Sequence, residues 1–278
     1  AYSRDGKTWT DINGSRPVFN AYDDEVWLRD PYLHRVTHNG KTKFHLIHTW
    51  GWDHPALFHW ESDDLIHWTA ANGGTRTDDG KIMLMDGHDG GPVSPNAWAP
   101  EFTYDGQTGT FYLYWSSRIG DRQVHHYCTT KDWFTFSTPA VYFDPGFTAI
   151  DMTILKEGDT YYAYYKDERN GEKTIRCATS KSLDPRVQRF EGSTPLLPSR
   201  YIEVGPEVFP AIGGKGWFLY FDKFNGDRGV SYTGCTDPSQ HKWYPIPDDE
   251  IRNPTEVKHG SVEIISTAEL EKLLEHFK

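Results

Sequence analysis

A short phrase recurs along the chain: a hydroxyl residue, an Asp two positions later, and an aromatic residue further on. Clear copies lie at 3–9, 62–68 and 130–136, and weaker copies lie at 180–190 and 236–243. The aromatic residues that end the copies are 53 to 68 residues apart. A period of this length is typical of folds in which one small structural unit packs against the next copy of itself.

Each repeat also carries paired segments with the composition of β-strands. The pairs are 43–49 with 56–60, 111–117 with 124–127, 161–166 with 175–177, and 217–222 with 229–232. Aromatic and β-branched residues in short alternating runs, separated by Gly, Asn and Asp, favour strands joined by tight turns. Five such units predict an all-β fold, a five-bladed β-propeller. In each phrase the Asp carboxylate is expected to accept backbone N–H groups within a turn.

The two ends of the chain are expected to meet. The first phrase begins at residue 3 with no full repeat before it, and no phrase follows the predicted last strand at 261–266. We therefore expect residues 1–278 to form one domain whose fifth blade is closed by both ends, with further residues upstream of Ala1. The one predicted helix starts after a capping box made by Ser266 and Glu269, and its leucines follow helical spacing.

Composition excludes several classes of protein. Aromatic residues make up 15% of the chain, which is too many for long disorder. The net charge of −11 argues against sequence-independent binding of nucleic acid. No apolar run approaches the roughly 20 residues of a membrane helix. Cys128, Cys177 and Cys235 fall in different repeats and are expected to be free thiols. No signal peptide is visible, so the compartment stays open, with secretion or a periplasmic location as alternatives.

The residues that open the repeats are the candidates for chemistry, because the inner strands of a propeller line its central funnel. Acids stand at three of these openings: 29–31, 150–153 and 203–207. The other two carry Trp98 ahead of Glu101, and His259 ahead of Gly260. Carboxylates that share one pocket push their pKa values apart, which supplies an acid and a base at one pH. Cleavage of a glycosidic bond requires such a pair.

The motifs Arg29-Asp30-Pro31, Trp98-Ala99-Pro100-Glu101, Ile150-Asp151-Met152-Thr153 and His259-Gly260 occur in the order found in glycoside hydrolase family 43, which this chain resembles from residue 3 to 266. The resemblance implies an inverting hydrolase in which Asp30 is the general base. It implies that Asp151 holds and tunes the general acid. In such enzymes the acid and the base stand roughly 6.5–9.5 Å apart.

The chain departs from the family pattern at the general acid, which is the Glu of a Glu-Gly-Pro motif. Here Val204 precedes Gly205-Pro206, and Glu203 comes before it. Three alternatives remain. A one-residue bulge could return Glu203 to the pocket, which is the alternative we favour. Glu207 could act instead, or the acid could be lost.

Substrate-binding candidates are drawn from the openings and from the loops after the first strand of each repeat. Tryptophan faces suit sugar rings, and basic side chains suit ring hydroxyls. Packing between blades and surface salt bridges are the competing interpretations. The candidates are Trp50, Trp52, Trp98, Arg118, Lys166, Glu207, Arg228 and His259.

No metal ligands and no required cofactor are predicted. The histidines between 45 and 67 lack the spacing of a zinc protease helix. Some members of the resembling family carry calcium in the axial channel, so an axial calcium ion beside His259 is left open.

The expected function is an exo-acting glycoside hydrolase. The family resemblance points to terminal α-L-arabinofuranoside, β-D-galactofuranoside or β-D-xyloside residues, with plant or microbial polysaccharide side chains as the carbohydrate partner. The alternative is a non-catalytic carbohydrate-binding propeller that has lost its acid. A sialidase-like propeller ranks third, because the repeat openings do not supply an arginine cluster.

Overall fold

The computed structural model describes the whole chain except residues 20–27, 74–76, 197–201, 214–215, 225–229 and 236–241. Four antiparallel four-stranded sheets follow one another along the sequence. Their strands are β3 (Leu28–His38), β4 (Lys41–Trp50), β5 (Ala56–Ser62) and β6 (Lys81–Met83); β7 (Trp98–Asp105), β8 (Thr110–Ile119), β9 (Arg122–Thr130) and β10 (Ala140–Phe143); β11 (Ala149–Glu157), β12 (Thr160–Asp167), β13 (Ile175–Ser180) and β14 (Glu191–Pro195); β15 (Glu203–Pro210), β16 (Trp217–Lys223), β17 (Val230–Cys235) and β18 (Trp243–Pro245). The predicted all-β class is confirmed.

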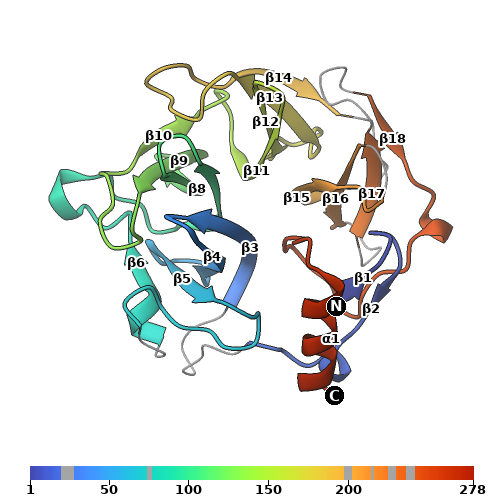
Figure 1. Cartoon of the computed structure of the whole chain (residues 1–278). Helices are drawn as coiled ribbons and strands as arrows, with labels where there is room; N and C mark the ends of the chain where they lie inside the picture. Colours follow the sequence, from blue (N-terminus) through green and yellow to red (C-terminus); the bar gives the residue numbers. More distant parts are fainter. Residues whose placement is uncertain (20–27, 74–76, 197–201, 214–215, 225–229, 236–241) are drawn as a thin grey trace.

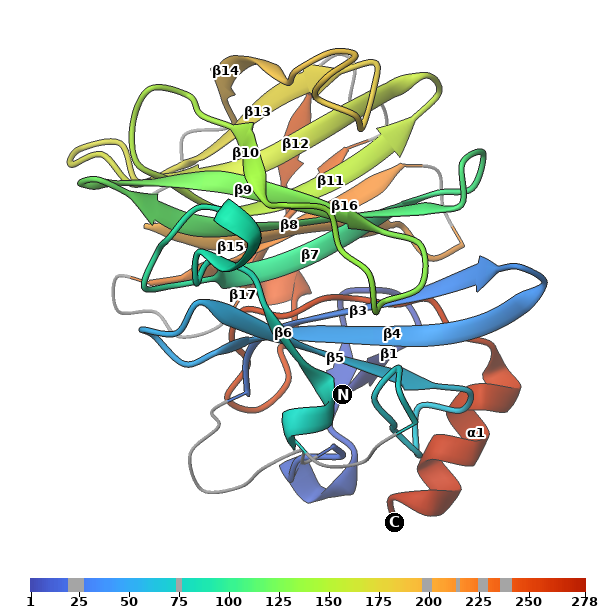
Figure 2. The ribbon, with the colours of Figure 1, turned by 90° about the vertical axis from the view of Figure 1, so that its left-hand side faces the viewer.

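The sheets are arranged around a common centre, with the first strand of each nearest to it (Figure 1). Contacts run from β3 to β7, from β7 to β11 and from β11 to β15. The side view shows the three sheets that begin with β3, β7 and β11 lying one after another (Figure 2). The first strands therefore bring residues from distant parts of the sequence to one axis.

Aromatic side chains fill the spaces between neighbouring sheets. Ile47 and Phe102 share one buried cluster, and Tyr114 and Tyr165 share the next. A third cluster joins Tyr164 to Trp243. Each sheet thus buries both of its faces, which explains why the chain needs so many large apolar rings.

The repeated Asp phrase forms the predicted turn. The Oδ1 atom of Asp5 accepts the N–H groups of Lys7 and Thr8 at 2.8 and 2.6 Å. Asp64 and Asp132 each accept the N–H groups two and three residues further along the chain, at 2.8–2.9 Å. These bonds outweigh burial and lower the pKa of Asp5 and of Asp64 to about 2. The fifth copy falls largely on residues 236–241, outside the described part of the chain.

The two termini meet in the remaining sector. Strands β1 (Tyr2–Ser3) and β2 (Trp9–Thr10) pair with each other. The backbone N–H of Trp9 donates to Arg252 O at 2.9 Å, and the N–H of Arg252 donates to Lys7 O at 3.0 Å. The predicted strand at 261–266 is wrong. There the edge of β3 is bonded by side chains: the N–H groups of Leu33 and Arg35 donate to Ser261 Oγ and Glu263 Oε2.

One α-helix is present in the described residues, and it is the predicted one. Helix α1 (Thr267–His276) begins with the capping box of Ser266 and Glu269. Leu273 packs against Phe44 of β4 and against Leu65, which lies in the turn after β5. The described part of the chain also contains short 3-10 helices at Asn13–Ser15, Thr77–Gly80, His88–Gly90 and Asp248–Glu250. None of the described helices is long and apolar enough to cross a membrane. Cys128 and Cys177 are free and buried, as predicted; the side chain of Cys235 lies outside the description.

Candidate active site

The four inner strands share one irregularity at the axis. The pairing of each first strand with its second shifts register next to a residue with positive φ. That residue is Asp30 (48°), Ala99 (44°), Asp151 (54°) or Gly205 (60°). A non-glycine side chain in this region is strained, and a bulge re-aims the side chains around it. The bulges show which residues of the four motifs are structurally equivalent. Val204 precedes its bulge as Arg29, Trp98 and Ile150 precede theirs.

A second set of side chains stands directly across from the residues that precede the bulges: Thr49, Ser116, Lys166 and Asp222. Three members accept a backbone N–H from the next sector. Thr49 Oγ1 accepts from Ala99 at 2.9 Å, Ser116 Oγ accepts from Asp151 at 3.1 Å, and Asp222 Oδ2 accepts from His259 at 3.0 Å. The backbone N–H of His259 therefore makes the same kind of contact with the fourth sheet that the N–H groups of Ala99 and Asp151 make with the first and second sheets.

Lys166 breaks this pattern because an ammonium group cannot accept a hydrogen bond. The N–H of Gly205 donates instead to Asp151 Oδ2 at 3.2 Å. The Lys166 ammonium is buried and pairs with Glu168 Oε1 at 2.7 Å. Asp151 consequently ties the third sheet to the bulge of the fourth.

The result is a largely buried cluster of three carboxyl groups around one imidazole: Asp30, Asp151, Asp222 and His259. Nδ1 of His259 lies 3.4 Å from Asp30 Oδ1. Burial opposes the charged imidazole, but Asp30, Asp151 and Asp222 outweigh it and raise the pKa of His259 to about 10. A Cβ at position 205 would lie 2.6 Å from the His259 ring, so only glycine fits there.

The three carboxyl groups of this cluster are shifted in opposite directions. Burial raises the pKa of Asp30, but the bond to His259 and its charge reverse this effect and leave the pKa below its ordinary value. Burial raises the pKa of Asp151, and it raises that of Asp222 to about 6. The cluster therefore contains an ionised carboxylate beside carboxyl groups that hold their protons more tightly, which is the requirement for paired acid and base chemistry.

A second acidic pair lies two residues beyond the bulges. Glu101 accepts the Tyr114 hydroxyl at 3.1 Å. Glu207 accepts the Thr153 hydroxyl at 3.4 Å and the N–H of Val262 at 3.2 Å. Burial raises the pKa of Glu207 to about 8, and burial with the charge of Glu207 raises the pKa of Glu101 well above its usual range. Both side chains therefore favour the neutral form near neutral pH.

Two hydrogen bonds tie the Glu203 side chain to the start of β13. Its Oε2 accepts the Thr174 hydroxyl at 2.9 Å and the N–H of Ile175 at 2.8 Å, so the side chain is held against β13. A bulge is present, as predicted, but it begins after Val204. It therefore re-aims Gly205 and Pro206 and leaves Glu203 and Val204 on opposite faces of β15.

An aromatic and basic group adjoins the cluster. The Arg29 guanidinium stacks over the Trp52 ring at 3.4 Å, and Trp98 Nε1 donates to Trp52 O at 2.6 Å. The rings of Trp52 and Trp98 meet edge to face at 5.7 Å, and Trp52 is 54% exposed. Arg29 and Trp98 directly precede Asp30 and Ala99, which places this group at the rim of the cluster.

The other predicted binding residues lie elsewhere or outside the description. Trp50 stacks on His54 at 3.9 Å and packs against the edge of Phe58 within its own sheet. Arg118 is exposed near the end of β8. Arg228 falls among the residues that are not described. Trp50 and Arg118 are thus not brought into the central cluster by any contact that the structure gives them.

Sequence reasoning missed Asp222 and Arg29 as site residues. Arg29 belongs to the first motif, but the sequence does not show that its guanidinium stacks on Trp52. Asp222 ends a predicted strand, and only the pairing of β16 with β15 places it opposite Val204. If the strand pairing seen at the other three bulges is applied to the fourth repeat, it places Asp222 opposite Val204.

One group of described residues away from the axis has the donor atoms of a metal site. It consists of His45, His59 and Glu61 on β4 and β5. The axial calcium ion beside His259 stays an open alternative.

Comparisons with known proteins identify the family of the chain. Residues 1–271 match the family model described as a probable glycosyl hydrolase domain, related to family 43. An α-L-arabinofuranosidase of Bifidobacterium longum is 28% identical over 76% of this chain, which spans 21% of that relative's length.

Solved structures with the same fold include a thermostable family-43 glycoside hydrolase, with a TM-score of 0.59 and 19% identity over 83% of this chain and 74% of the other. They also include a family-43 arabinoxylan arabinofuranohydrolase from Bacillus subtilis, with a TM-score of 0.57 and 16% identity over 78% of this chain and 51% of the other. Because the family model covers nearly all 278 residues, the chain belongs to the glycosyl hydrolases related to family 43.

Proposed function

We propose that the protein is an inverting, exo-acting glycoside hydrolase that removes terminal furanoside or xyloside residues from polysaccharide side chains. Its frame is a five-bladed propeller whose fifth blade is made by both ends of the chain. The observation that carries the proposal is the cluster in which Asp30 lies 3.4 Å from the His259 ring and Asp222 accepts the His259 N–H at 3.0 Å. The pKa of Asp30 is lowered there and that of Asp222 is raised, which agrees with a base and an acid.

Asp30 is the proposed general base. The charged His259 ring lies 3.4 Å from its Oδ1 and keeps the carboxylate ionised. An ionised carboxylate at the axis can take a proton from a water molecule that attacks the anomeric carbon. Asp151 is a positioning residue, because its Oδ2 holds the N–H of Gly205 and so fixes the fourth bulge against the third sheet.

Asp222 is the proposed general acid, in place of Glu203 or Glu207. It stands directly across from Val204, the position at which the resembling family carries its Glu, and paired residues of neighbouring strands share a face. The N–H of His259 holds Oδ2, whereas the buried Oδ1 has no hydrogen-bond partner among the described residues. That oxygen is available to carry a proton.

The chemical step follows from these roles. A water oxygen forms a bond to the anomeric carbon and passes a proton to Asp30. The bond between the anomeric carbon and the glycosidic oxygen breaks, and Asp222 protonates the leaving oxygen. Attack from the face opposite the leaving group inverts the configuration.

The choice of sugar rests on the rim group and on the relatives. Trp52 and Trp98 supply apolar faces and Arg29 supplies donors, a combination suited to a sugar ring. The curated relative is named an α-L-arabinofuranosidase, and one solved structure is an arabinoxylan arabinofuranohydrolase. An α-L-arabinofuranoside is therefore the first substrate to test, followed by β-D-galactofuranoside and β-D-xyloside.

The test is release of 4-nitrophenol from the three aryl glycosides, with the anomer of the released sugar followed by proton NMR. We expect turnover of at least one of them and a first-formed sugar of inverted configuration. Retention of configuration, or turnover that Asp30→Asn leaves intact, would contradict the proposal. Asp159→Asn is the matched control, since the Asp159 side chain is 90% exposed.

A further inference from the structure

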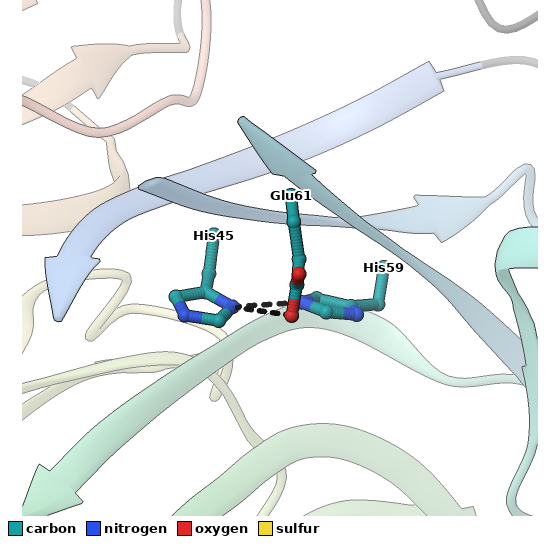
Figure 3. A group of neighbouring side chains, drawn as sticks. All are labelled: His45, His59 and Glu61. Atoms are coloured by element: carbon teal, nitrogen blue, oxygen red, sulfur yellow. Dashed lines mark hydrogen bonds and ion pairs between the residues drawn. The ribbon is translucent and has the colours of Figure 1, made fainter. Parts of the chain in front are cut away.

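His45, His59 and Glu61 lie on one face of the first sheet, away from the motif residues at the axis. His45 on β4 pairs directly with Glu61 on β5, and His59 stands two residues before Glu61 on the same strand. Residues two apart on a strand share a face. Figure 3 shows the three side chains converging, with the Glu61 carboxylate between the two imidazole rings and dashed lines from His45 to both His59 and Glu61.

The separations of the donor atoms suit a small cation. Nδ1 of His45 is 3.0 Å from His59 Nε2 and 3.7 Å from Glu61 Oε1. One donor atom from each residue lies within 4.8 Å of the others. Ligands that each lie 2.0–2.2 Å from a tetrahedral Zn²⁺ are about 3.3–3.6 Å apart, so the separations of His45 from His59 and from Glu61 lie close to this range.

One hydrogen bond cannot link all three groups of this cluster, whereas a cation can. The single Nδ1 of His45 faces two groups, His59 Nε2 and Glu61 Oε1. A neutral imidazole nitrogen can donate one proton to one of them or accept from one of them, and cannot serve both. A cation between the three groups would bind all three lone pairs at once.

The surroundings hold the two rings in place. The ring of His59 stacks on Trp133 at 3.6 Å, and the ring of His45 is stacked on the same side chain at 5.3 Å. Both histidines are buried, so packing fixes the directions in which their nitrogens point.

The site opens to solvent on one side. A cavity of about 310 Å³ is lined by Lys43, His45, Glu61 and Asp132, among others. It provides room for water ligands, which a three-residue site requires. Lys43 currently supplies the positive charge opposite Glu61, with Nζ 2.6 Å from Oε2, and its side chain is 34% exposed and can swing outward.

We propose that His45, His59 and Glu61 form a binding site for Zn²⁺ or a similar first-row divalent ion, completed by water, and that Lys43 competes with the metal for Glu61. Two imidazoles and one carboxylate favour such ions over Ca²⁺, which takes oxygen ligands. The site lies on one sheet and uses none of the residues of the proposed active site.

The test is titration of the chelator-treated protein with Zn²⁺, followed by calorimetry or by competition with a chromogenic chelator. We expect one ion per chain. Glu61→Gln should weaken binding roughly 10-fold or more, and His59→Gln roughly 100-fold. Lys43→Met should strengthen binding, because it removes the competing ammonium. His67→Gln is the matched control: His67 belongs to the same sheet region, is 79% exposed, and should leave the affinity unchanged.

Three results would overturn the proposal: no stoichiometric Zn²⁺ binding, the same affinity in wild type and Glu61→Gln, or weaker binding in Lys43→Met. The melting temperature of each variant shows whether it is folded. Lys43→Met and Glu61→Gln alter partly exposed side chains, so the test does not depend on the buried His59 variant. Because the readout is metal binding, the result is independent of hydrolytic activity.

Discussion

Two sets of acids stand around one axis, and they differ in their contact with a cation. Asp30 lies beside the charged ring of His259, with Asp151 and Asp222 around the same ring. Glu101 and Glu207 instead have hydroxyl groups and one backbone N–H as their bonded partners. The pKa of Asp30 is lowered, whereas that of Asp222 is raised to about 6 and that of Glu207 to about 8. Contact with the cation thus separates Asp30 from the other acids, and the set around His259 contains both a base and an acid.

The largest effect is expected at the base. Asp30→Asn keeps the shape of the side chain but removes the proton acceptor beside His259, so kcat/KM should fall roughly 1,000-fold or more. The measurement is the rate of arabinofuranoside hydrolysis. The exposed variant Asp159→Asn should stay at the wild-type rate. A loss of less than about 10-fold in Asp30→Asn would mean that the base lies elsewhere.

The second prediction tests whether Asp222 or Glu203 is the general acid. It compares how much each variant slows cleavage of substrates with poor and good leaving groups. Asp222→Asn should slow cleavage of an arabinoxylan linkage roughly 100-fold, because that oxygen needs a proton to leave. With a 2,4-dinitrophenyl glycoside, whose leaving group needs none, the loss should be under about 10-fold. Glu203→Gln should affect both substrates alike, through the bonds to Thr174 and Ile175. If Glu203→Gln instead shows the selective loss, the acid is Glu203.

The third prediction concerns His259, whose positive charge can be removed by substitution while Asp30, Asp151 and Asp222 are kept. His259→Gln takes away the charge that lowers the pKa of Asp30, so burial should then raise that pKa. Because a base must be ionised to act, the acidic limb of the pH profile of kcat/KM should move to higher pH. Rates measured from pH 3 to 7 give this limb. An unchanged limb would show that His259 does not set the charge of Asp30.

The smallest effect concerns stability and the second set of acids. Glu207 keeps its proton in the folded protein up to about pH 8, whereas the unfolded chain loses it near the ordinary Glu value. The unfolded state therefore binds fewer protons between those values, and stability falls as pH rises through this window. Glu207→Gln should flatten the decline by about 1–3 kcal/mol, as measured by urea unfolding at pH 5 and pH 8. An identical slope in the variant would mean that Glu207 is ionised.

Local sequence patterns were sufficient for much of the fold. The repeated phrase located the turns at Asp5, Asp64 and Asp132, and the capping box located the start of α1. Such features depend on residues a few positions apart. The strand predicted at 261–266 failed because side chains, not a backbone ladder, bond this segment to β3.

The motifs also located the bulges that carry Asp30 and Asp151, but not what stands across from them. Asp222 belongs to the cluster through the pairing of β15 with β16, and His45 meets Glu61 through the pairing of β4 with β5. Neither partner can be read from spacing along the chain. The orientation of Glu203 likewise depends on where the bulge starts.

The central claim is that one cluster around His259 holds both the base and the acid. Its most direct test is the pH profile of kcat/KM on arabinoxylan for wild type and Asp222→Asn. The wild type should give a bell-shaped profile with an alkaline limb near pH 6, since Asp222 must hold a proton. Asp222→Asn should lose this limb and keep the acidic one. An alkaline limb that survives in Asp222→Asn would show that Asp222 is not the acid.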